Sequence, residues 1–192
     1  MDAKKKLKVW SVVGVFAVFG LASGWHFLYS DVLRTGFTAV LAPVNESPWE
    51  HAKLFFMPAI IWYVILYFIA GREFSNFVFS HAAALIVMPV FMLAAYYIYS
   101  RFVEDTNVLD IVNTFLTAAL GQYTAYKLTT SRLRLSGPGF NTGSPKSRKT
   151  FWGVNTAAAV IVIGILALFI VFTFYPPQCD LFFDRSRMKY GI

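Results

Sequence analysis

The stretch PVNESPWEHAKLFFMPAIIWYVILYFIA, residues 43–70, decides the fold class. It opens with nine mostly polar or turn-forming residues and continues as a predominantly apolar run without the alternation of a strand. A helix needs about 20 such residues to cross a hydrocarbon core of about 30 Å. In hydrocarbon every backbone N–H and C=O must be paired within the structure, which favours a helix over an open strand. The stretch therefore predicts a membrane-spanning helix with a polar entrance.

The rest of the chain repeats this pattern. Of its 192 residues, 57% are hydrophobic and only 14% are charged, which lies outside the usual composition of a soluble domain. The first apolar run is too long, and ends in residues too bulky, for a cleaved signal peptide, so we interpret it as a retained span. The sequence predicts a single all-α transmembrane domain, an integral membrane bundle of about five helices. The expected spans are 9–29, 48–70, 74–100, 107–127 and 151–175.

The connecting segments differ in composition. Residues 31–42 are too short to span and carry apolar side chains at helical spacing, which predicts a short interfacial helix, with a re-entrant segment as the alternative. Residues 131–150 are rich in Gly, Pro, Ser and basic residues, which is typical of a flexible cytoplasmic loop. Residues 176–192 form a tail that contains an apolar LFF. We expect this tail to fold back over the outer end of the bundle.

The distribution of lysine and arginine predicts the orientation. With the N-terminus inside, the inner segments hold eleven of the 17 cations and the outer segments hold six, which favours a cytoplasmic N-terminus and an extracytoplasmic C-terminus in the cell membrane. Basic loops beside anionic lipid explain the net charge of +7, so the sequence gives no reason to expect a nucleic-acid partner. The expected partners are the lipid bilayer and a second copy of the chain or another membrane protein. The single cysteine, Cys179, excludes an intramolecular disulfide.

The polar entrance of the second span has a conventional explanation in part. Ser47 stands three residues before Glu50 and is followed by Pro48, which is the pattern of a capping box with proline at the first helical position. Ser47 is expected to accept from the Glu50 N–H while the Glu50 carboxylate reaches back to the Ser47 N–H. Capping leaves Asn45, Glu46 and His51 unexplained.

Histidines and carboxylates gather at the same predicted depth on the outer side. His51 begins the second span and His26 ends the first. Histidine with carboxylate suits zinc or another divalent ion, and equally suits proton transfer. The spacing matches no known metal or catalytic motif, so the sequence does not identify a cofactor or a catalysed reaction. The alternative to a metal or catalytic role is that each histidine ring hydrogen-bonds a nearby backbone group. The ligand candidates are His26, Glu46, Glu50, His51, Asp180 and Asp184.

Further polar residues lie within the predicted spans. An ionisable group in hydrocarbon is costly unless it is paired, so such residues are functional candidates or bonds between helices. For His81 we favour a bond to another helix over a working role. Asp110 can simply complement the start of its helix. The intramembrane candidates are His81, Asp110, Asn113 and Gln122.

Small residues indicate where helices approach each other. Gly20 and Gly24 have GxxxG spacing in the first span, and Thr117 and Gly121 belong to an inward stripe of the fourth. This pattern supports a second hypothesis, a non-enzymatic membrane scaffold or accessory subunit. Intramembrane prolines and aromatics support a third, a small carrier for a hydrophobic molecule. We rank a polar outer site that binds a metal ion or a small ligand ahead of both.

Several motifs resemble a known family. GWHFLY at 24–29, PVNESPWEHAKLFFMP at 43–58, YPP at 175–177 and a late YG at 190–191 resemble a family of small multi-pass bacterial membrane proteins known as a domain of unknown function. The resemblance spans most of the chain, with the PVNES-x-WEH core as its most distinctive part. It implies an integral membrane bundle with no established activity, and it assigns no catalytic or binding residues.

Overall fold

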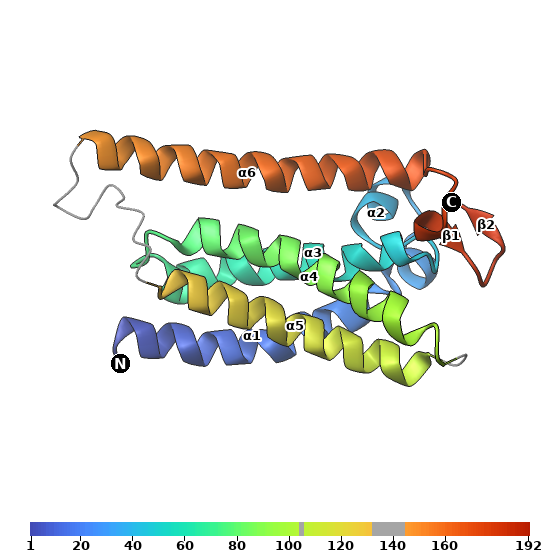
Figure 1. The fold of residues 1–192 in the computed structure, drawn as a ribbon, viewed down its shortest axis with the longest axis horizontal. Helices are drawn as coiled ribbons and strands as arrows, with labels where there is room; N and C mark the ends of the chain where they lie inside the picture. Colours follow the sequence, from blue (N-terminus) through green and yellow to red (C-terminus); the bar gives the residue numbers. More distant parts are fainter. Residues whose placement is uncertain (104–105, 132–144) are drawn as a thin grey trace.

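Five long helices dominate the part of the chain that the computed structural model describes, which is residues 1–103, 106–131 and 145–192, without the side chains of 145–151. They confirm the predicted all-α bundle (Figure 1). The N-terminus and the C-terminus lie at opposite ends, as an odd number of lengthwise helices requires. The five helices are α1 (Ala3–Trp25), α3 (Pro48–Leu66), α4 (Phe77–Tyr99), α5 (Asn107–Thr129) and α6 (Pro145–Phe174).

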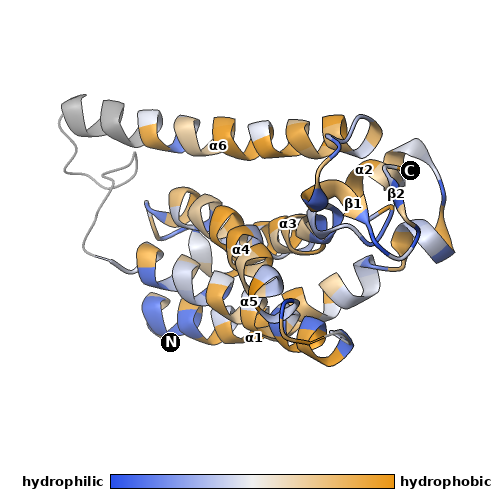
Figure 2. Ribbon diagram, turned by 45° about the vertical axis from the view of Figure 1, so that its right-hand side comes forward, coloured by the Kyte–Doolittle hydropathy of each residue, from blue (hydrophilic) through white to orange (hydrophobic). Residues whose placement is uncertain are grey.

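Four of these helices are long and apolar enough to cross a membrane, one fewer than the expected number of spans. They are Ala3–Trp25, Pro48–Gly71, Phe77–Tyr99 and Trp152–Phe174. The exception, α5, has spanning length but carries polar residues on the face that packs against α1 and α4. The polar residues of α5 are therefore shielded by neighbouring helices. In the bundle as a whole, apolar residues are concentrated along the helices and hydrophilic residues gather towards the ends (Figure 2).

The helix bounds depart from the expected spans mainly at polar ends. The first helix starts at Ala3 instead of residue 9, because the lysines that precede the apolar run are good helix formers. The last helix starts at Pro145, so the predicted loop 131–150 overlaps it. Residues 132–144 of that loop lie outside the described part of the chain. Beyond Leu66, α3 continues as a π-helical turn, Tyr67–Gly71.

The segment expected to be one interfacial helix is divided. Its beginning belongs to a π-helical turn, Leu28–Val32, and only α2 (Gly36–Leu41) is an α-helix. Thr35 caps α2 by accepting from the Thr38 N–H, while the Thr38 hydroxyl accepts from the Thr35 N–H. Phe37 on this helix is 73% exposed, as suits a helix that lies at an apolar boundary.

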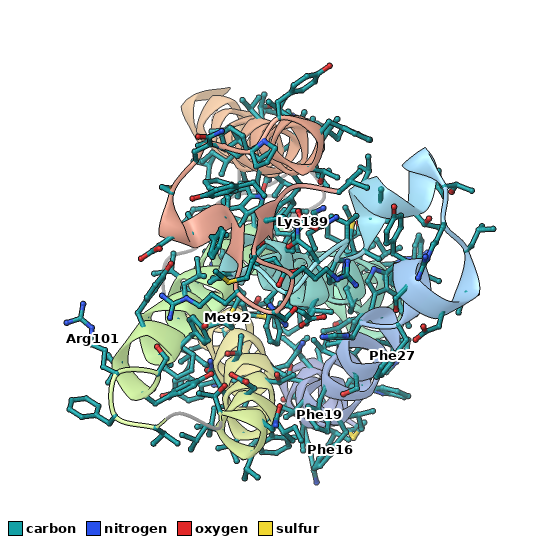
Figure 3. The ribbon with its side chains drawn as sticks, turned by 90° about the vertical axis from the view of Figure 1, so that its right-hand side faces the viewer. Phe16, Phe19, Phe27, Met92, Arg101 and Lys189 are labelled. Atoms are coloured by element: carbon teal, nitrogen blue, oxygen red, sulfur yellow. The ribbon has the colours of Figure 1, made fainter. Side chains whose placement is uncertain are left out.

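The core forms around α3. In its apolar window 61% of the residues are buried, against 17% in α6, which runs beside the bundle. Figure 3 looks along the helices from the end that carries the tail, with Met92 inside and Arg101 projecting outward. Phe169 attaches α6 to the core, because its ring lies 5.2 Å from those of Trp49 and Phe56. Nearer its start, α6 still packs on the bundle, since Ala158 is only 5% exposed.

The glycines that allow close helix packing are not the two that GxxxG spacing indicates. Gly20 and Gly24 are exposed, and a Cβ at either would meet nothing within 4 Å. A Cβ at Gly14 would lie 2.2 Å from the Trp62 indole nitrogen, and one at Gly121 would lie 2.3 Å from the Met88 sulfur. GxxxG describes spacing along one helix and does not say which face meets the neighbours, so Gly14 went unrecognised.

The tail folds back over the end of the bundle, as predicted. A 3₁₀ turn (Asp180–Phe182) leads into β1 (Phe183–Asp184), which pairs antiparallel with β2 (Lys189–Tyr190). The Phe182 ring packs beside Trp49 of α3, with centroids 5.2 Å apart. This contact covers apolar surface and holds the hairpin close to the loop that precedes α3.

A buried ion pair joins four segments at this end. Lys53 is 0% exposed and Glu50 is 2% exposed, and the Lys53 ammonium lies 2.7 Å from Glu50 Oε2. The ammonium also donates to the Ala39 carbonyl of α2 at 3.0 Å and to the hydroxyl of Thr173 in α6. Glu50 Oε2 accepts from the Val44 N–H at 3.0 Å. Each charge is therefore compensated, which a buried ion requires.

We predict that breaking this pair destabilises the fold strongly. Lys53→Met leaves a buried carboxylate and Glu50→Gln leaves a buried ammonium, so each should lower the free energy of unfolding by about 3–5 kcal/mol. The double variant Lys53→Met with Glu50→Gln buries no net charge and should recover most of the loss. Unfolding in mixed micelles measures all three, with Lys189→Met on the exposed tail as control. Single variants as stable as the control would contradict the prediction.

Candidate functional site

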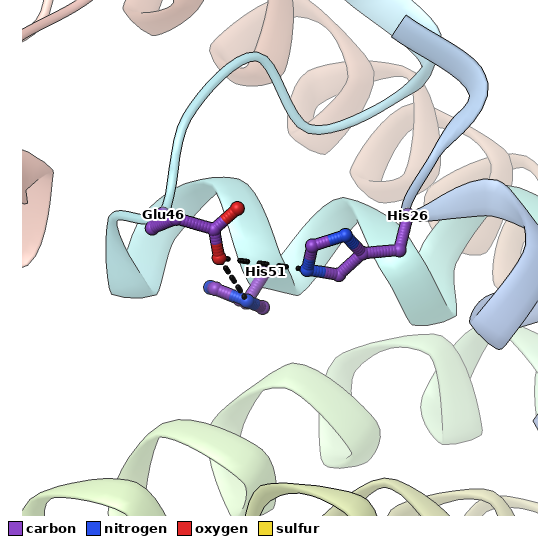
Figure 4. A group of neighbouring side chains, drawn as sticks. All are labelled: His26, Glu46 and His51. Carbon is purple, nitrogen blue, oxygen red and sulfur yellow. Dashed lines mark ion pairs between the residues drawn. The ribbon is translucent and has the colours of Figure 1, made fainter. Parts of the chain in front are cut away.

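Three side chains from separate segments meet at the tail end of the bundle (Figure 4). His26 is the residue at which α1 ends, Glu46 lies in the loop before α3, and His51 is in the first turn of α3. The chain reverses direction between the two helices, so the end of one and the start of the other lie at the same level. This arrangement agrees with the depth expected from the sequence.

One carboxylate oxygen lies between the two imidazoles. Glu46 Oε2 is 3.5 Å from His26 Nε2 and 3.4 Å from His51 Nε2. One ligand atom from each residue can be chosen so that all three lie within 4.8 Å of one another. The two rings are 5.5 Å apart between centroids. All three side chains keep some contact with solvent, with 30–31% exposure for the histidines and 44% for Glu46.

A backbone contact determines which nitrogen of His51 faces the cluster. His51 Nδ1 lies 3.1 Å from the Ser47 carbonyl oxygen, which can only accept, so Nδ1 carries the proton. A neutral ring then presents the Nε2 lone pair to the Glu46 carboxylate, where two acceptors would face each other. A proton or a cation between them removes that conflict. Histidine ligands of metals are commonly oriented by such a bond from the second nitrogen.

The tail positions the loop that carries Glu46. Asp184 Oδ2 accepts from the Glu46 N–H at 3.1 Å, and the Asn45 amide donates to the Gly191 carbonyl at 2.8 Å. The Asp184 side chain is fully buried. Burial alone would raise its pKa, but hydrogen bonds, led by the Ser186 hydroxyl and including the Glu46 N–H, hold the pKa below its ordinary value. Asp184 thus contacts the backbone N–H of Glu46 and is not itself part of the cluster of His26, Glu46 and His51.

The electrostatics of the cluster favour an ionised Glu46. When Nε2 of each ring carries a proton, hydrogen bonds from His26 and then from His51 stabilise the carboxylate, and these outweigh the opposing effect of partial burial. The pKa of Glu46 is therefore far below its ordinary value. The site is anionic unless a proton or a cation joins it.

The cluster faces two cavities. One, of 310 Å³, is lined by residues that include Tyr99 and Arg185. The other, of 560 Å³, is lined by residues of α1, α3 and α5, among them Phe19 and Ile111. Glu46 and His51 line both cavities, so the three-residue cluster is reachable from either side.

Asp110 lines both cavities as well and belongs to a hydrogen-bond network between α4 and α5. Its carboxylate accepts from the Tyr99 hydroxyl and, at 2.8 Å, from the Thr106 hydroxyl. Asn113 one turn further donates to the Met92 carbonyl at 3.0 Å. Asp110 therefore does more than complement the start of its helix, and Tyr99 is a partner that sequence spacing did not indicate.

Other predicted candidates lie elsewhere. Ser47 caps α3 and Pro48 takes its first position, as expected, but only half of the capping box forms. The Ser47 N–H donates to Asn45 Oδ1 at 2.9 Å, while the Glu50 carboxylate binds Lys53. Glu50 is thus engaged outside the cluster. Asp180 is exposed and lies 3.9 Å from Arg185.

The remaining candidates from the predicted spans lie in the interior of the bundle. His81 is buried and bonds the Phe77 carbonyl of its own helix at 2.7 Å, not another helix as favoured from the sequence. Thr117 is fully buried, as the inward stripe of α5 predicts. Gln122 is also buried, beside Gly14. Lys53 is one of the six cations of the outer segments, and the sequence did not indicate that it is buried in an ion pair with Glu50. It is the polar residue of greatest structural consequence that was not among the candidates.

The fold and the cluster define the class of protein: a helical bundle with apolar helices compatible with a membrane protein and a histidine–glutamate group at one end. The chain belongs to a family of unknown function (DUF6512), whose sequence model matches residues 1–135. Comparison with curated proteins and with solved structures finds no match. The family match spans α1 to α5 and includes His26, Glu46 and His51. YPP and the late YG lie beyond it.

We predict that the contribution of Glu46 to stability depends on pH. Because its folded pKa is depressed, the contribution should be complete near pH 6 and decline as pH falls below the ordinary value of 4.5. Solvent screening of this 44% exposed side chain limits the effect to at most about 1 kcal/mol. Unfolding of the metal-free protein and of Glu46→Gln between pH 6 and pH 3 measures the difference. Asp180→Asn is the control, and a gap unchanged at pH 3 would refute the prediction.

Proposed function

We propose that this protein is a multi-pass membrane protein that binds one divalent metal ion, of the zinc type, through His26, Glu46 and His51. The observation that carries the proposal is the convergence of one carboxylate oxygen and two imidazole nitrogens from three segments. Two histidines and one carboxylate are a ligand set known from catalytic zinc sites. Such a set leaves the fourth position of a tetrahedral ion open.

The distances suit an ion of this size. Ligands bound to zinc at 2.0–2.1 Å with tetrahedral angles lie about 3.3 Å from each other. The two nitrogen–oxygen distances of 3.5 and 3.4 Å are close to this value. The gap between the two nitrogens can close by rotation of His26, whose polar contact among the described residues is with Glu46 alone.

The charges also support a cation. The depressed pKa of Glu46 leaves a carboxylate at neutral pH, and protonating both imidazoles would place two positive charges beside one negative charge. A divalent ion satisfies all three lone pairs at once. The Nδ1–H of His51, which donates to the Ser47 carbonyl, supplies the orienting bond expected around a metal ligand.

The open position faces the two cavities, one polar and one more apolar. A metal ion placed there would bind water or a small molecule that reaches it from either cavity, and would make the water more acidic. Asp110 and Tyr99 line the polar cavity and would be available to hydrogen-bond such a molecule.

We place the cluster on the extracytoplasmic side. Lys4, Lys5, Lys6 and Lys8 lie at the start of α1, at the end of the bundle opposite the cluster. The excess of cations at that end favours the cytoplasm. The tail and the cluster would then face the outside of the cell membrane.

Metal titration tests the proposal. After treatment with a chelator, the purified protein should bind one Zn²⁺ per chain, and Co²⁺ should give the absorption of a tetrahedral site. His51→Ala, His26→Ala and Glu46→Gln should each weaken binding by about a hundredfold or more, because each removes a direct ligand. Excess Zn²⁺ should raise the unfolding midpoint of the parent protein but not of these variants.

Asp180→Asn is the matched control, because this carboxylate lies at the same end but outside the cluster. It should bind Zn²⁺ as the parent does. Absence of stoichiometric metal, or equal affinity in the parent and the His51→Ala variant, would refute the metal site.

The exposed Cys179 tests the orientation, because it is the single cysteine and lies in the tail. A membrane-impermeant maleimide added to intact cells should label it, and Cys179→Ala should abolish the signal. Lys5→Cys in the Cys179→Ala background should be labelled only after the membrane is opened. The reverse pattern of labelling would place the cluster in the cytoplasm.

A further inference from the structure

A further cavity lies in the opposite half of the bundle, between α3, α4 and α6. Its volume is 540 Å³. It lies between α6 and the two helices beside it, on the side of Phe169 that leads towards the start of α6. The walls come from the later part of α3, the first half of α4 and residues 158–166 of α6. The metal ligands proposed above do not line it.

The lining is apolar and uncharged. It consists of aliphatic and aromatic side chains, such as Val64, Leu85 and Val162, together with two tyrosines and one histidine. No Asp, Glu, Lys or Arg is among the lining residues. A charged group placed there would lose its hydration without gaining a partner, which is strongly unfavourable. The cavity therefore suits an apolar molecule of zero net charge.

Two polar groups interrupt this lining. Tyr63 is only 5% exposed, and its hydroxyl is buried without a hydrogen-bond partner among the described residues. His81, whose ring lies 4.4 Å from that of Tyr63, donates from Nδ1 to the Phe77 carbonyl at 2.7 Å. The neutral ring therefore keeps Nε2 as an acceptor. A hydroxyl donor and an imidazole acceptor therefore lie at neighbouring positions directly behind the apolar surface of the cavity, and a small movement of the Tyr63 side chain is needed to bring its hydroxyl to a ligand.

The His81 ring is rigidly held. It stacks on Phe77 with ring centroids 3.7 Å apart and an interplanar angle of 23°, and Tyr63 meets it edge to face. A ring held on two sides by aromatic neighbours cannot turn towards solvent to find a partner. The Nε2 atom of His81 is thus held in place beside the cavity.

We propose that this cavity binds a neutral lipid that carries one uncharged oxygen group, such as a long-chain alcohol or a ketone-bearing chain. The hydrocarbon chain lies along the apolar wall between α4 and α6. The oxygen accepts from the Tyr63 hydroxyl, and where it is itself a hydroxyl it donates to His81 Nε2. A hydrocarbon tail without an oxygen would leave both groups without a hydrogen-bond partner, which costs free energy for a buried polar group.

Photolabelling in phosphatidylcholine nanodiscs tests the proposal. The probe is hexadecanol with a diazirine in its chain, compared with the matching hexadecane and with the matching hexadecyl phosphate. The alcohol should label peptides that contain residues 60–68 and 158–166, and the alkane and the phosphate should label them much less. The mapped peptides distinguish the cavity from the outer lipid-facing surface.

Two variants separate the hydrogen bond from the cavity. Tyr63→Phe removes only the hydroxyl and should reduce labelling by the alcohol about tenfold. Tyr67→Phe, on the same wall, is the matched control and should leave labelling unchanged. Ala159→Phe fills the space from α6 and should abolish labelling while Tyr63 stays in place, which covers the case in which Tyr63→Phe fails to fold.

Equal labelling by alkane and alcohol, or by phosphate and alcohol, would overturn the proposal, as would unchanged labelling of Tyr63→Phe or of Ala159→Phe. If a water molecule bonds the two groups instead, excess unlabelled hexadecanol will not reduce labelling by the probe, and this result would also overturn the proposal. His51→Ala should retain labelling, so the result does not depend on the metal site.

Discussion

The ion pair between Lys53 and Glu50 is the interaction on which the site end of the molecule depends. Both charges are buried, and an ammonium inside an apolar bundle is tolerated only where acceptors surround it. Those acceptors come from α2, α3 and α6, and the Glu50 carboxylate in turn holds the backbone of the loop before α3. The pair therefore specifies which segments meet, and it does so a few residues from His51.

Burial of this pair is not by itself a source of stability, since desolvating two charges offsets much of their attraction. Its effect is on arrangement. The pair binds α6 through Thr173 near one end of that helix, and the apolar cavity lies nearer the other end, beside residues 158–166. A polar, solvent-reachable cluster and an apolar cavity thus occupy opposite halves of one bundle.

Much of the fold could be predicted from the sequence because its signals are local. Ser47 and Pro48 mark the start of α3, and the apolar run that follows has the length of a span. The meeting of His26, Glu46 and His51 could be expected because consecutive antiparallel helices bring their joined ends to one level. The polar stripe of α5 indicated its inward face, although it also makes α5 less apolar than the other four.

The rest could not be predicted because it depends on distant partners. Glu50 resembles a capping residue locally, yet its carboxylate binds Lys53, which in turn contacts Thr173, 120 residues further along. Gly14 has no small neighbour at the spacing of a packing motif, and its importance follows from Trp62 and Gln122 approaching from other helices. Spacing along a single helix carries no information about either contact.

The attachment of Glu46 to Asp184 has a consequence for biosynthesis. The two residues are 138 positions apart, so Asp184 is made long after Glu46. Glu46 therefore acquires this hydrogen bond only after α3, α4, α5 and α6 have been synthesised. The same holds for Asn45, whose amide binds the carbonyl of Gly191. The loop that carries Glu46 thus reaches its final arrangement only after the helices of the bundle have been made.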